Sequence, residues 1–284
     1  MNTNNLVLNR LFTQNVFHDL IHYNENSIYG TVVQRYATDA EGRSNGELIS
    51  EIYSFLSKSY RNEYFYQNTL LNKLLLGKHS LNTTTALTQT PIGKSKADFI
   101  LINGKAVVYE IKSELDSFER LDTQLKDYYK AFNHVCVVTS ESFFEKISNI
   151  LKNSSAGIYV LTKKNTFSTR MRKEPIENNS YLNHTSIFKM LHKREFEVIL
   201  EKYFGNLPVT SQVFYYDACL SLFSEIPIMK AYEMVLVELK KRNRIVFSEF
   251  DDVPYELKSL AYFYNPGETD YKALRDFLNA RFRG

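Results

Sequence analysis

The sequence predicts a mixed α/β protein, with helices flanking a mixed β-sheet and a mainly helical region following it. Two apolar segments, Ala97–Ile102 and Lys105–Lys112, are separated by Asn103-Gly104, which is the pattern of a β-hairpin. Further apolar strand segments then alternate with helical ones, the order typical of βαβ units. Beyond about residue 183, the apolar residues recur at helical spacing.

The composition is that of a globular protein with room for one large domain or two ordinary ones. Of 284 residues, 44% are hydrophobic and 24% charged, and 35 basic against 32 acidic side chains give a net charge of +3. This balance excludes a uniformly basic nucleic-acid binder, so any basic surface must be local. Cys136 and Cys219 lie in apolar segments, which indicates buried thiols in a reducing compartment. With no apolar stretch of about 18 residues and no visible secretory signal, we expect a cytoplasmic protein without a membrane partner.

The first 44 residues are interpreted as an N-terminal extension. A short amphipathic segment from Leu8 to Leu20 precedes a polar stretch over Asn26 to Arg43 that we expect to be irregular. A helix is predicted from Asn45-Gly46, with helical spacing of apolar residues up to Leu56, and a second helix over residues 62–76, ending before Gly77.

An α/β domain is predicted over residues 45–165. After the two helices come a β-branched strand at 83–90 and the hairpin. A helix at 118–132, with Asp116 as its cap, follows the hairpin. The domain ends with a buried parallel strand at 134–139, a helix at 144–151 and a strand at 157–161. A polar linker over 166–183 separates this domain from a helical domain over 184–284. We expect the helical domain to select the substrate or a protein partner.

Glu110 and Lys112 are the first candidates for a chemical role. They are two residues apart on one predicted strand, so their side chains leave the strand on the same face. The surrounding segment is apolar, and burying a carboxylate and an ammonium is costly without compensation. A divalent cation, Mg²⁺ or Mn²⁺, together with a phosphate substrate would compensate both charges.

Asp98 supplies a second carboxylate if the hairpin has the right register. A two-residue loop at Asn103-Gly104 would place Asp98 and Glu110 on opposite faces. A three-residue loop that begins at Ile102, with Gly104 left-handed, pairs Leu101 with Lys105 and puts the two acids and Lys112 on one face. Metal chemistry therefore requires this bulged turn, or an equivalent bulge elsewhere in either strand.

The helix after the hairpin adds Arg120, Gln124 and Tyr128, each one turn from the next. Arg120 could reach a phosphate, and Gln124 a water held by the metal or a base edge, although both could equally form the solvated flank of the helix. Tyr128 lies on the apolar stripe, so we expect its ring in the core and only its hydroxyl near nucleic acid. Upstream, Glu47 is the candidate for a further acidic ligand, with Glu51 as its alternative.

These residues resemble the PD-(D/E)XK nuclease superfamily. Asp98 followed by Glu110-Ile-Lys112 after a hairpin is similar to its active-site motif, and Gln124-Leu-Lys-Asp-Tyr128 resembles the Q-x-x-x-Y motif of the RecB-like branch. The longer segment from Glu110 to Gln124 is similar to an uncharacterised bacterial group of nuclease-like proteins. The resemblance covers about residues 45–162, with Ala97 in place of the motif's proline.

The resemblance implies a restriction-endonuclease-like fold with an αβββαβ core. It implies a hydrolase that cleaves phosphodiester bonds with a divalent metal. Asp98, Glu110 and Glu47 would be metal ligands, Lys112 the catalytic lysine, and Gln124 a further active-site residue.

A basic segment follows the last strand of this core, and no acidic residue lies between Gly157 and Lys173. Contact with a phosphate backbone is one interpretation and a solvated loop is the other. The candidate nucleic-acid-binding residues here are Lys163, Lys164, Arg170, Arg172 and Lys173.

The sequence therefore predicts a magnesium-dependent nuclease, with DNA the favoured substrate. The alternative is a nucleic-acid-binding or regulatory module, or a protein-interaction module, that keeps the fold without turnover. A structural ion pair at a sheet end is the competing explanation for Asp98, Glu110 and Lys112, but charges in the middle of an apolar strand favour a functional site.

Overall fold

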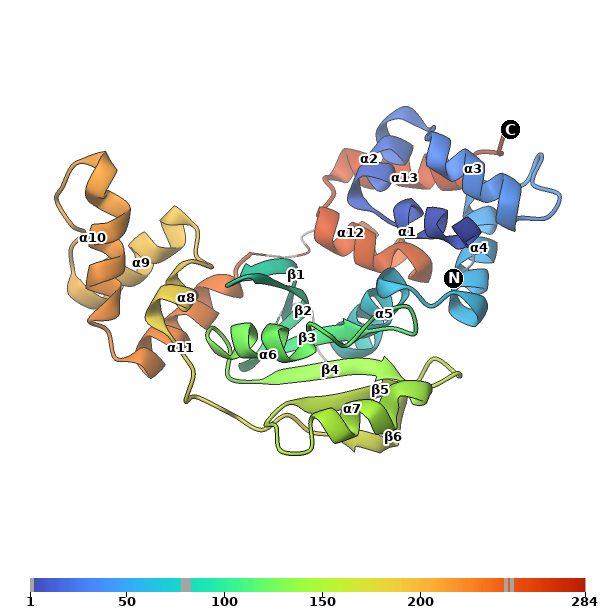
Figure 1. The fold of residues 1–284 in the computed structure, drawn as a ribbon. Helices are drawn as coiled ribbons and strands as arrows, with labels where there is room; N and C mark the ends of the chain where they lie inside the picture. Colours follow the sequence, from blue (N-terminus) through green and yellow to red (C-terminus); the bar gives the residue numbers. More distant parts are fainter. Residues whose placement is uncertain (1–2, 78–82, 243–244, 246–247, 284) are drawn as a thin grey trace.

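The computed structural model describes residues 3–77, 83–242, 245 and 248–283, and shows a mixed α/β protein with a six-stranded sheet between two groups of helices (Figure 1). The strands lie in the sheet in chain order. The central β3, β4 and β5 are parallel, and β1, β2 and β6 are antiparallel to their neighbours. The strands are β1 (Thr85–Ile92), β2 (Ser95–Asn103), β3 (Lys105–Lys112), β4 (Val135–Ser140), β5 (Gly157–Leu161) and β6 (Phe167–Lys173).

One face of the sheet is covered by helices from both ends of the chain. Phe99, Leu101 and Tyr109 on this face belong to the same buried cluster as Phe17 near the N-terminus and Phe277 near the C-terminus. The helices of this group are α1 (Leu8–Leu11), α2 (Gln14–Tyr23), α3 (Ser27–Tyr36), α4 (Asn45–Ser59), α5 (Glu63–Leu70), the π-helix Leu71–Leu76, α12 (Lys258–Tyr264) and α13 (Glu268–Asn279).

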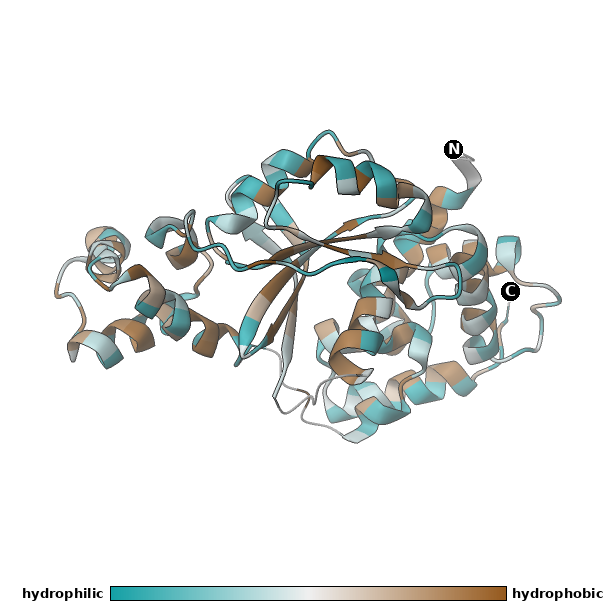
Figure 2. Cartoon of the chain, turned by 90° about the horizontal axis from the view of Figure 1, so that it is seen from below, coloured by the Kyte–Doolittle hydropathy of each residue, from teal (hydrophilic) through white to brown (hydrophobic). Residues whose placement is uncertain are grey.

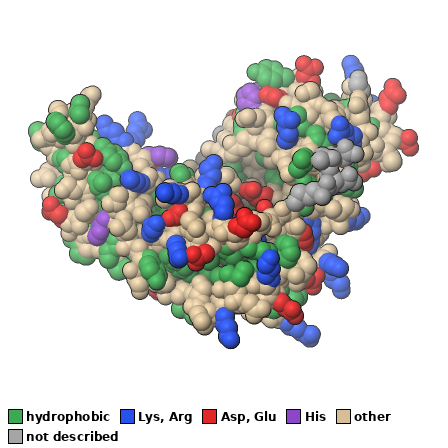
Figure 3. Space-filling view, in the orientation of Figure 1, with side chains coloured by type: hydrophobic (Ala, Val, Ile, Leu, Met, Phe, Trp, Pro, Cys, Tyr) green, Lys and Arg blue, Asp and Glu red, His purple; other side chains and the backbone are tan. Residues whose placement is uncertain are grey.

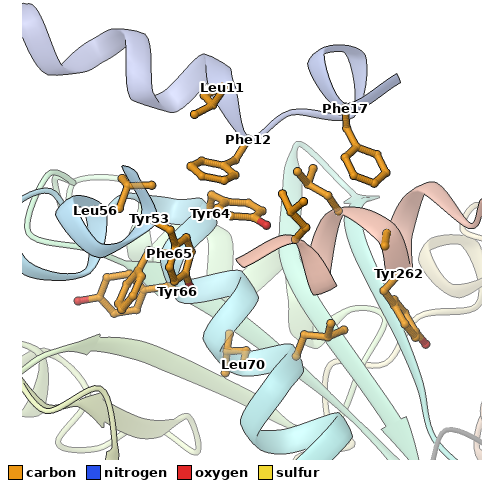
Figure 4. Packing of buried hydrophobic residues seen from close by; sticks show 14 of the residues in the cluster. Leu11, Phe12, Phe17, Tyr53, Leu56, Tyr64, Phe65, Tyr66, Leu70 and Tyr262 are labelled. Atoms are coloured by element: carbon orange, nitrogen blue, oxygen red, sulfur yellow. The ribbon is translucent and has the colours of Figure 1, made fainter. Parts of the chain in front are cut away.

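Aromatic side chains join these distant segments. Phe12 stacks on Tyr64 of α5 with ring centroids 4.5 Å apart, and Tyr53 of α4 meets Phe12 edge-on (Figure 4). Tyr262 of α12 is hydrogen-bonded to the backbone of β1, because its hydroxyl accepts the amide of Ala86 at 2.9 Å. The two ends of the chain are therefore part of one core.

The other face of the sheet packs against helices from the middle of the chain. Ile100, Val108 and Val137 on this face share a buried cluster with Tyr128 and with Phe188 (Figure 2 shows the apolar strands between the helices). The helices here are α6 (Leu121–Tyr129), α7 (Phe144–Ile150), α8 (His184–Phe188), α9 (Lys193–Phe204), α10 (Gln212–Ser224) and α11 (Ile228–Leu239).

Three expectations from the sequence are wrong. The stretch from Asn26 to Arg43 contains helix α3, which Asn26 caps and which buries Tyr29, Val32 and Val33. Residues 166–183 are not simply a linker, because β6 extends the sheet there by pairing with β5. The last hundred residues are not one helical domain: α8–α11 pack on one face of the sheet, and α12 and α13 pack with the N-terminal helices on the other.

The remaining elements agree closely with the sequence. The strands at 105–112 and 157–161 are confirmed at both ends, and the parallel strand is confirmed as Val135–Ser140. Cys136 and Cys219 are buried free thiols. Among the described residues, no helix combines the length and apolarity needed to cross a membrane.

Gly93 and Gly104 provide a matched test of this packing. Both are left-handed, with φ of 62° and 70°, but a Cβ on Gly93 would lie 2.8 Å from Oδ1 of Asp127, whereas nothing lies within 4 Å of one on Gly104. Asp127 cannot easily move, since it accepts hydrogen bonds from Lys94 N and Ser95 Oγ. Gly104→Ala should cost about 1–2 kcal/mol of unfolding free energy, the left-handed penalty alone. Gly93→Ala should cost clearly more in urea unfolding; equal costs would contradict the close contact.

Candidate active site

The β2–β3 hairpin places Asp98 beside Glu110. Its ladder pairs Asn103 with Lys105 and ends at Phe99 with Tyr109, and the next pair in this register is Asp98 with Glu110. Directly opposite residues in such a pair have Cβ atoms about 5 Å apart. The side chain of Asp98 also joins the two strands, because its Oδ2 accepts a hydrogen bond from the backbone amide of Ile111 in β3 at 2.8 Å.

Neither the two-residue nor the three-residue loop considered for this hairpin is observed, but the side chains face as the three-residue loop would have placed them. Gly104 is left-handed as expected, yet Lys105 pairs with Asn103 instead of Leu101. A shift of two residues preserves the facing of every side chain. The faces are therefore those required: Phe99, Leu101, Val107, Tyr109 and Ile111 pack on one side of the sheet, and the two acids and Lys112 alternate with them.

Glu110 is held from both sides in the interior. It is 1% exposed, and its Oε1 lies 2.9 Å from Nζ of Lys112, whose side chain is 8% exposed. Its Oε2 accepts a hydrogen bond of 2.6 Å from the hydroxyl of Tyr128. Lys112 Nζ also donates to Oε1 of Gln124 at 2.9 Å. Four side chains from β3 and α6 thus form one network, and Gln124 and Tyr128 lie where the one-turn spacing predicts.

The electrostatics of the site favour an additional positive charge. Burial raises the pKa of Asp98 well above its ordinary value, and repulsion from Glu110 and Glu63 raises it further. Burial, followed by the charge of Glu110, also raises the pKa of Tyr128, which keeps its hydroxyl a donor. Lys112 does not offset the repulsion that Asp98 meets from these two carboxylates.

Glu63, at the first turn of α5, is the helix acid that lies in the field of Asp98 and Glu110, and the predicted Glu47 is not. Desolvation raises the pKa of Glu63, and Asp116 and Glu110 raise it further, so Glu63 belongs electrostatically to this acidic group. Glu47 instead caps α4, where its Oε2 accepts the backbone amide of Ser44 at 2.9 Å. Glu51, the alternative, is paired with Arg43 at 2.6 Å.

Glu63 was missed because its helix lacks a distinguishing charge pattern. The only signal was its position: Asn62 is the N-cap of the helix that directly precedes the three-stranded core. Asp116 was expected to cap α6, but that helix begins at Leu121, and Asp116 instead accepts hydrogen bonds from the amide and hydroxyl of Ser113 at 2.8 and 2.6 Å.

A cleft of about 780 Å³ opens beside these acids, between the helices that carry the chain ends and the edge of β1. Glu63, Ser113 and Asp116 line it on the side of the site, and Phe12 and Phe263 on the side of the terminal helices. The space-filling view shows the molecule hollowed between its two helical groups, with acidic side chains gathered in the hollow and basic ones beside them (Figure 3).

The predicted nucleic-acid-binding residues divide into two groups. Lys163, Lys164, Arg170 and Arg120 are exposed. The two lysines follow β5, and therefore lie at the same edge of the parallel strands as Lys112, which ends β3.

The other three have structural roles. Tyr128 is fully buried. Lys173 Nζ donates to the carbonyls of Leu151 and Ser154, and Arg172 lies over the ring of Tyr159 at 4.1 Å and pairs with Glu174. These side chains are engaged within the fold, and that they also bind nucleic acid stays a prediction.

The donor set is chemically suited to a hard divalent cation. Carboxylate oxygens are the ligands Mg²⁺ prefers, and the mutual repulsion of Asp98, Glu110 and Glu63 is what such an ion would relieve. In the described part of the chain, no three His, Cys, Asp or Glu side chains already surround a common point. Asp98 and Glu110 would therefore hold the ion, with Glu63 nearby.

Comparison with known proteins gives the relationships of the chain. Residues 57–259 match the family described as Bacteriophage P4 protein cII. The chain belongs to this family. Protein cII of Enterobacteria phage P4 is 27% identical over 158 residues, which are 55% of this chain and 57% of that relative. No solved structure matches. The family match covers α5, the whole sheet and α6–α11, and so includes every member of the Asp98–Tyr128 site.

The raised pKa of Asp98 predicts a specific pH dependence of stability. A carboxyl whose pKa is higher in the folded than in the unfolded state loses stability as the pH rises from the unfolded pKa through the folded one. Asp98→Asn, which can still accept from Ile111 N, should therefore be more stable than wild type at neutral pH without metal. Urea unfolding of both proteins between pH 4 and 8 measures the difference in stability. Asp122→Asn, in an exposed ion pair with Lys126, is the control. If Asp98→Asn is less stable than wild type at neutral pH, the fold stabilises the ionised Asp98 and the prediction is wrong.

Proposed function

We propose that this protein is a divalent-metal-dependent nuclease that hydrolyses phosphodiester bonds, with DNA as its substrate. The observation that carries the proposal is the convergence of Asp98, Glu110, Lys112 and Gln124 at one point of the sheet. A buried carboxylate–lysine pair is costly, and a site of this kind is retained where its charges act on a ligand.

The element order also supports a restriction-endonuclease-like core. Helix α5, the strands β1, β2 and β3, helix α6 and strand β4 follow one another in the order αβββαβ. The two acids and the lysine come from β2 and β3, and Gln124 and Tyr128 from α6, as the PD-(D/E)XK resemblance implies.

Each side chain of the site has a distinct role in this proposal. Asp98 and Glu110 hold Mg²⁺ or Mn²⁺, and the bound ion supplies electrostatic activation of the phosphate and of water. Lys112 presents an ammonium to the negative charge that develops on the phosphate. Gln124 orients that ammonium through its 2.9 Å hydrogen bond, and Tyr128 orients Glu110. The exposed Lys163 and Lys164 contact the phosphate backbone.

A nucleic-acid-binding module without turnover is the second candidate. Both oxygens of Glu110 are already engaged, one by Lys112 and one by Tyr128, so this carboxylate has its partners without a metal. This proposal places the same basic residues on nucleic acid and assigns the acids to the stability of the sheet.

Substitution of the site separates the two candidates. Glu110→Ala should abolish metal binding and cleavage together, because a ligand is lost. Lys112→Ala should keep metal binding but slow cleavage by about 10²–10³, the usual loss when one electrostatic group is removed. Plasmid, linear and single-stranded substrates are assayed with Mg²⁺, Mn²⁺ or chelator, and thermal unfolding is measured in parallel. A wild type that binds nucleic acid but cleaves none of these with either metal would favour the non-catalytic module.

Glu63 and Glu47 form a matched pair for the helix acid. Glu63→Gln should reduce cleavage about tenfold or more and weaken the metal dependence, since Glu63 lies in the field of Asp98 and Glu110. Glu47→Gln should leave cleavage unchanged and lower the stability only slightly, since the glutamine oxygen can still accept from the Ser44 amide. If instead Glu47→Gln reduces cleavage and Glu63→Gln does not, Glu47 is the helix acid of the site.

A further inference from the structure

The cleft beside the acids has an unusual charge pattern. Its described lining includes the carboxylates of Glu63 and Asp116 but no Lys, Arg or His. Instead it contains five amide side chains, those of Asn9, Gln14, Asn62, Gln67 and Gln89. Its volume of about 780 Å³ lies within the range of sites that enclose a small organic ligand, about 300–1,000 Å³.

The cleft adjoins the strands that carry the candidate active site, although its lining includes none of Asp98, Glu110, Lys112 and Gln124. Thr88, in its wall, donates a hydrogen bond of 2.8 Å from Oγ1 to the carbonyl of Asp98. Ser113, also in the wall, directly follows Lys112 along the chain. Glu63 belongs to both, because it lines the cleft and raises the pKa of Asp98. Thr88, Ser113 and Glu63 thus mark the side of the site on which a neighbouring group of a bound substrate would meet the cleft.

Electrostatics exclude the phosphate backbone from this cleft. A duplex carries one negative charge per 3.4 Å on each strand, and these charges would meet two carboxylates and no cation. The exposed cations Lys163 and Lys164 lie outside its lining. The part of a nucleotide that suits the cleft is therefore the uncharged base.

The polar groups of the cleft are suited to base edges. Gln67 and Gln89 donate through Nε2 to Thr88 and Glu63, which leaves each Oε1 without a protein partner in the described part of the chain. Asn9 accepts a hydrogen bond from Asn62 through Oδ1, and its Nδ2 can donate to a ligand. Such amides form paired hydrogen bonds with bases. Phe263 is half-buried in the wall and offers an aromatic ring for stacking.

We propose that this cleft binds an unpaired nucleobase, from a single-stranded segment or a nucleotide turned out of its duplex, next to the phosphate that is cleaved. The inference deepens the proposed nuclease function and rests on it for the identity of the substrate. It assigns the terminal helices, which form one wall, to substrate recognition. A base can enter only after leaving its stack, which favours single-stranded or frayed ends.

Nucleoside binding to the full chain tests the cleft directly, without metal. Thymidine, adenosine, cytidine and guanosine are titrated by isothermal calorimetry and by ligand-observed NMR, each against its 5′-monophosphate. At least one nucleoside should bind saturably below 10 mM, and its monophosphate should bind no better. A monophosphate that binds tenfold tighter would reveal an anion site and overturn the proposal, as would the absence of saturable binding by all four.

Two substitutions locate the binding. Phe263→Ala should weaken nucleoside binding about five- to a hundredfold, the usual effect of removing a stacking ring. Gln14→Ala, at an exposed position that cannot unfold the protein, should weaken it by less. Tyr23→Ala on the same helix is the control, since this exposed ring lies outside the lining. Binding unchanged in both cleft variants would overturn the proposal.

The outcomes distinguish this inference from the nuclease proposal. Lys112→Ala should retain nucleoside binding while cleavage is lost. If the protein binds nucleosides in the cleft but cleaves no substrate, the base site is supported and the nuclease proposal is overturned. If the protein cleaves duplex and single strands equally and binds no nucleoside, the nuclease proposal is supported and the base site is overturned.

Discussion

The burial of Glu110 is the constraint on which the rest of the site depends. A carboxylate that is 1% exposed must be neutralised and hydrogen-bonded where it stands, and no water can replace those partners. Lys112, two residues along the same strand, supplies the charge, and Tyr128 supplies the hydrogen bond from α6. Because Lys112 is itself almost buried, it needs the oxygen of Gln124 in turn. The position of α6 against the sheet is therefore fixed by polar as well as apolar contacts.

Asp98 is the member of this group that the fold compensates least. It accepts one backbone hydrogen bond, from Ile111, but lies close to Glu110 and within the field of Glu63. Natural proteins place such like charges together at a cost in stability, and the cost is retained where the charges hold a ligand. The neighbouring Asp127 shows the contrast: hydrogen bonds from Lys94, Ser95 and Lys130 hold its pKa below the ordinary value despite burial.

The path of the chain explains how residues from both ends of the sequence come to line one cleft. Helices α1–α5 begin the chain and α12 and α13 end it, and all pack together over one face of the sheet. Their contact is a shared aromatic core, in which Phe12, Tyr53 and Tyr64 meet and Tyr262 reaches the backbone of β1. The cleft lies where this group meets the hairpin, so its lining combines residues more than 250 positions apart in sequence, such as Phe12 and Phe263.

The sequence by itself determined the strands of the hairpin, the alternation of their side chains and the one-turn spacing of Gln124 and Tyr128. These follow from local backbone geometry, which a period of two or of 3.6 residues records directly. Only the tertiary structure decided that Asn103 pairs with Lys105, that Glu63 and not Glu47 joins the acids, and that the last two helices return to the first. Each of these depends on which apolar faces meet. Many pairings of such faces would bury similar area, and the burial of apolar surface is not directional.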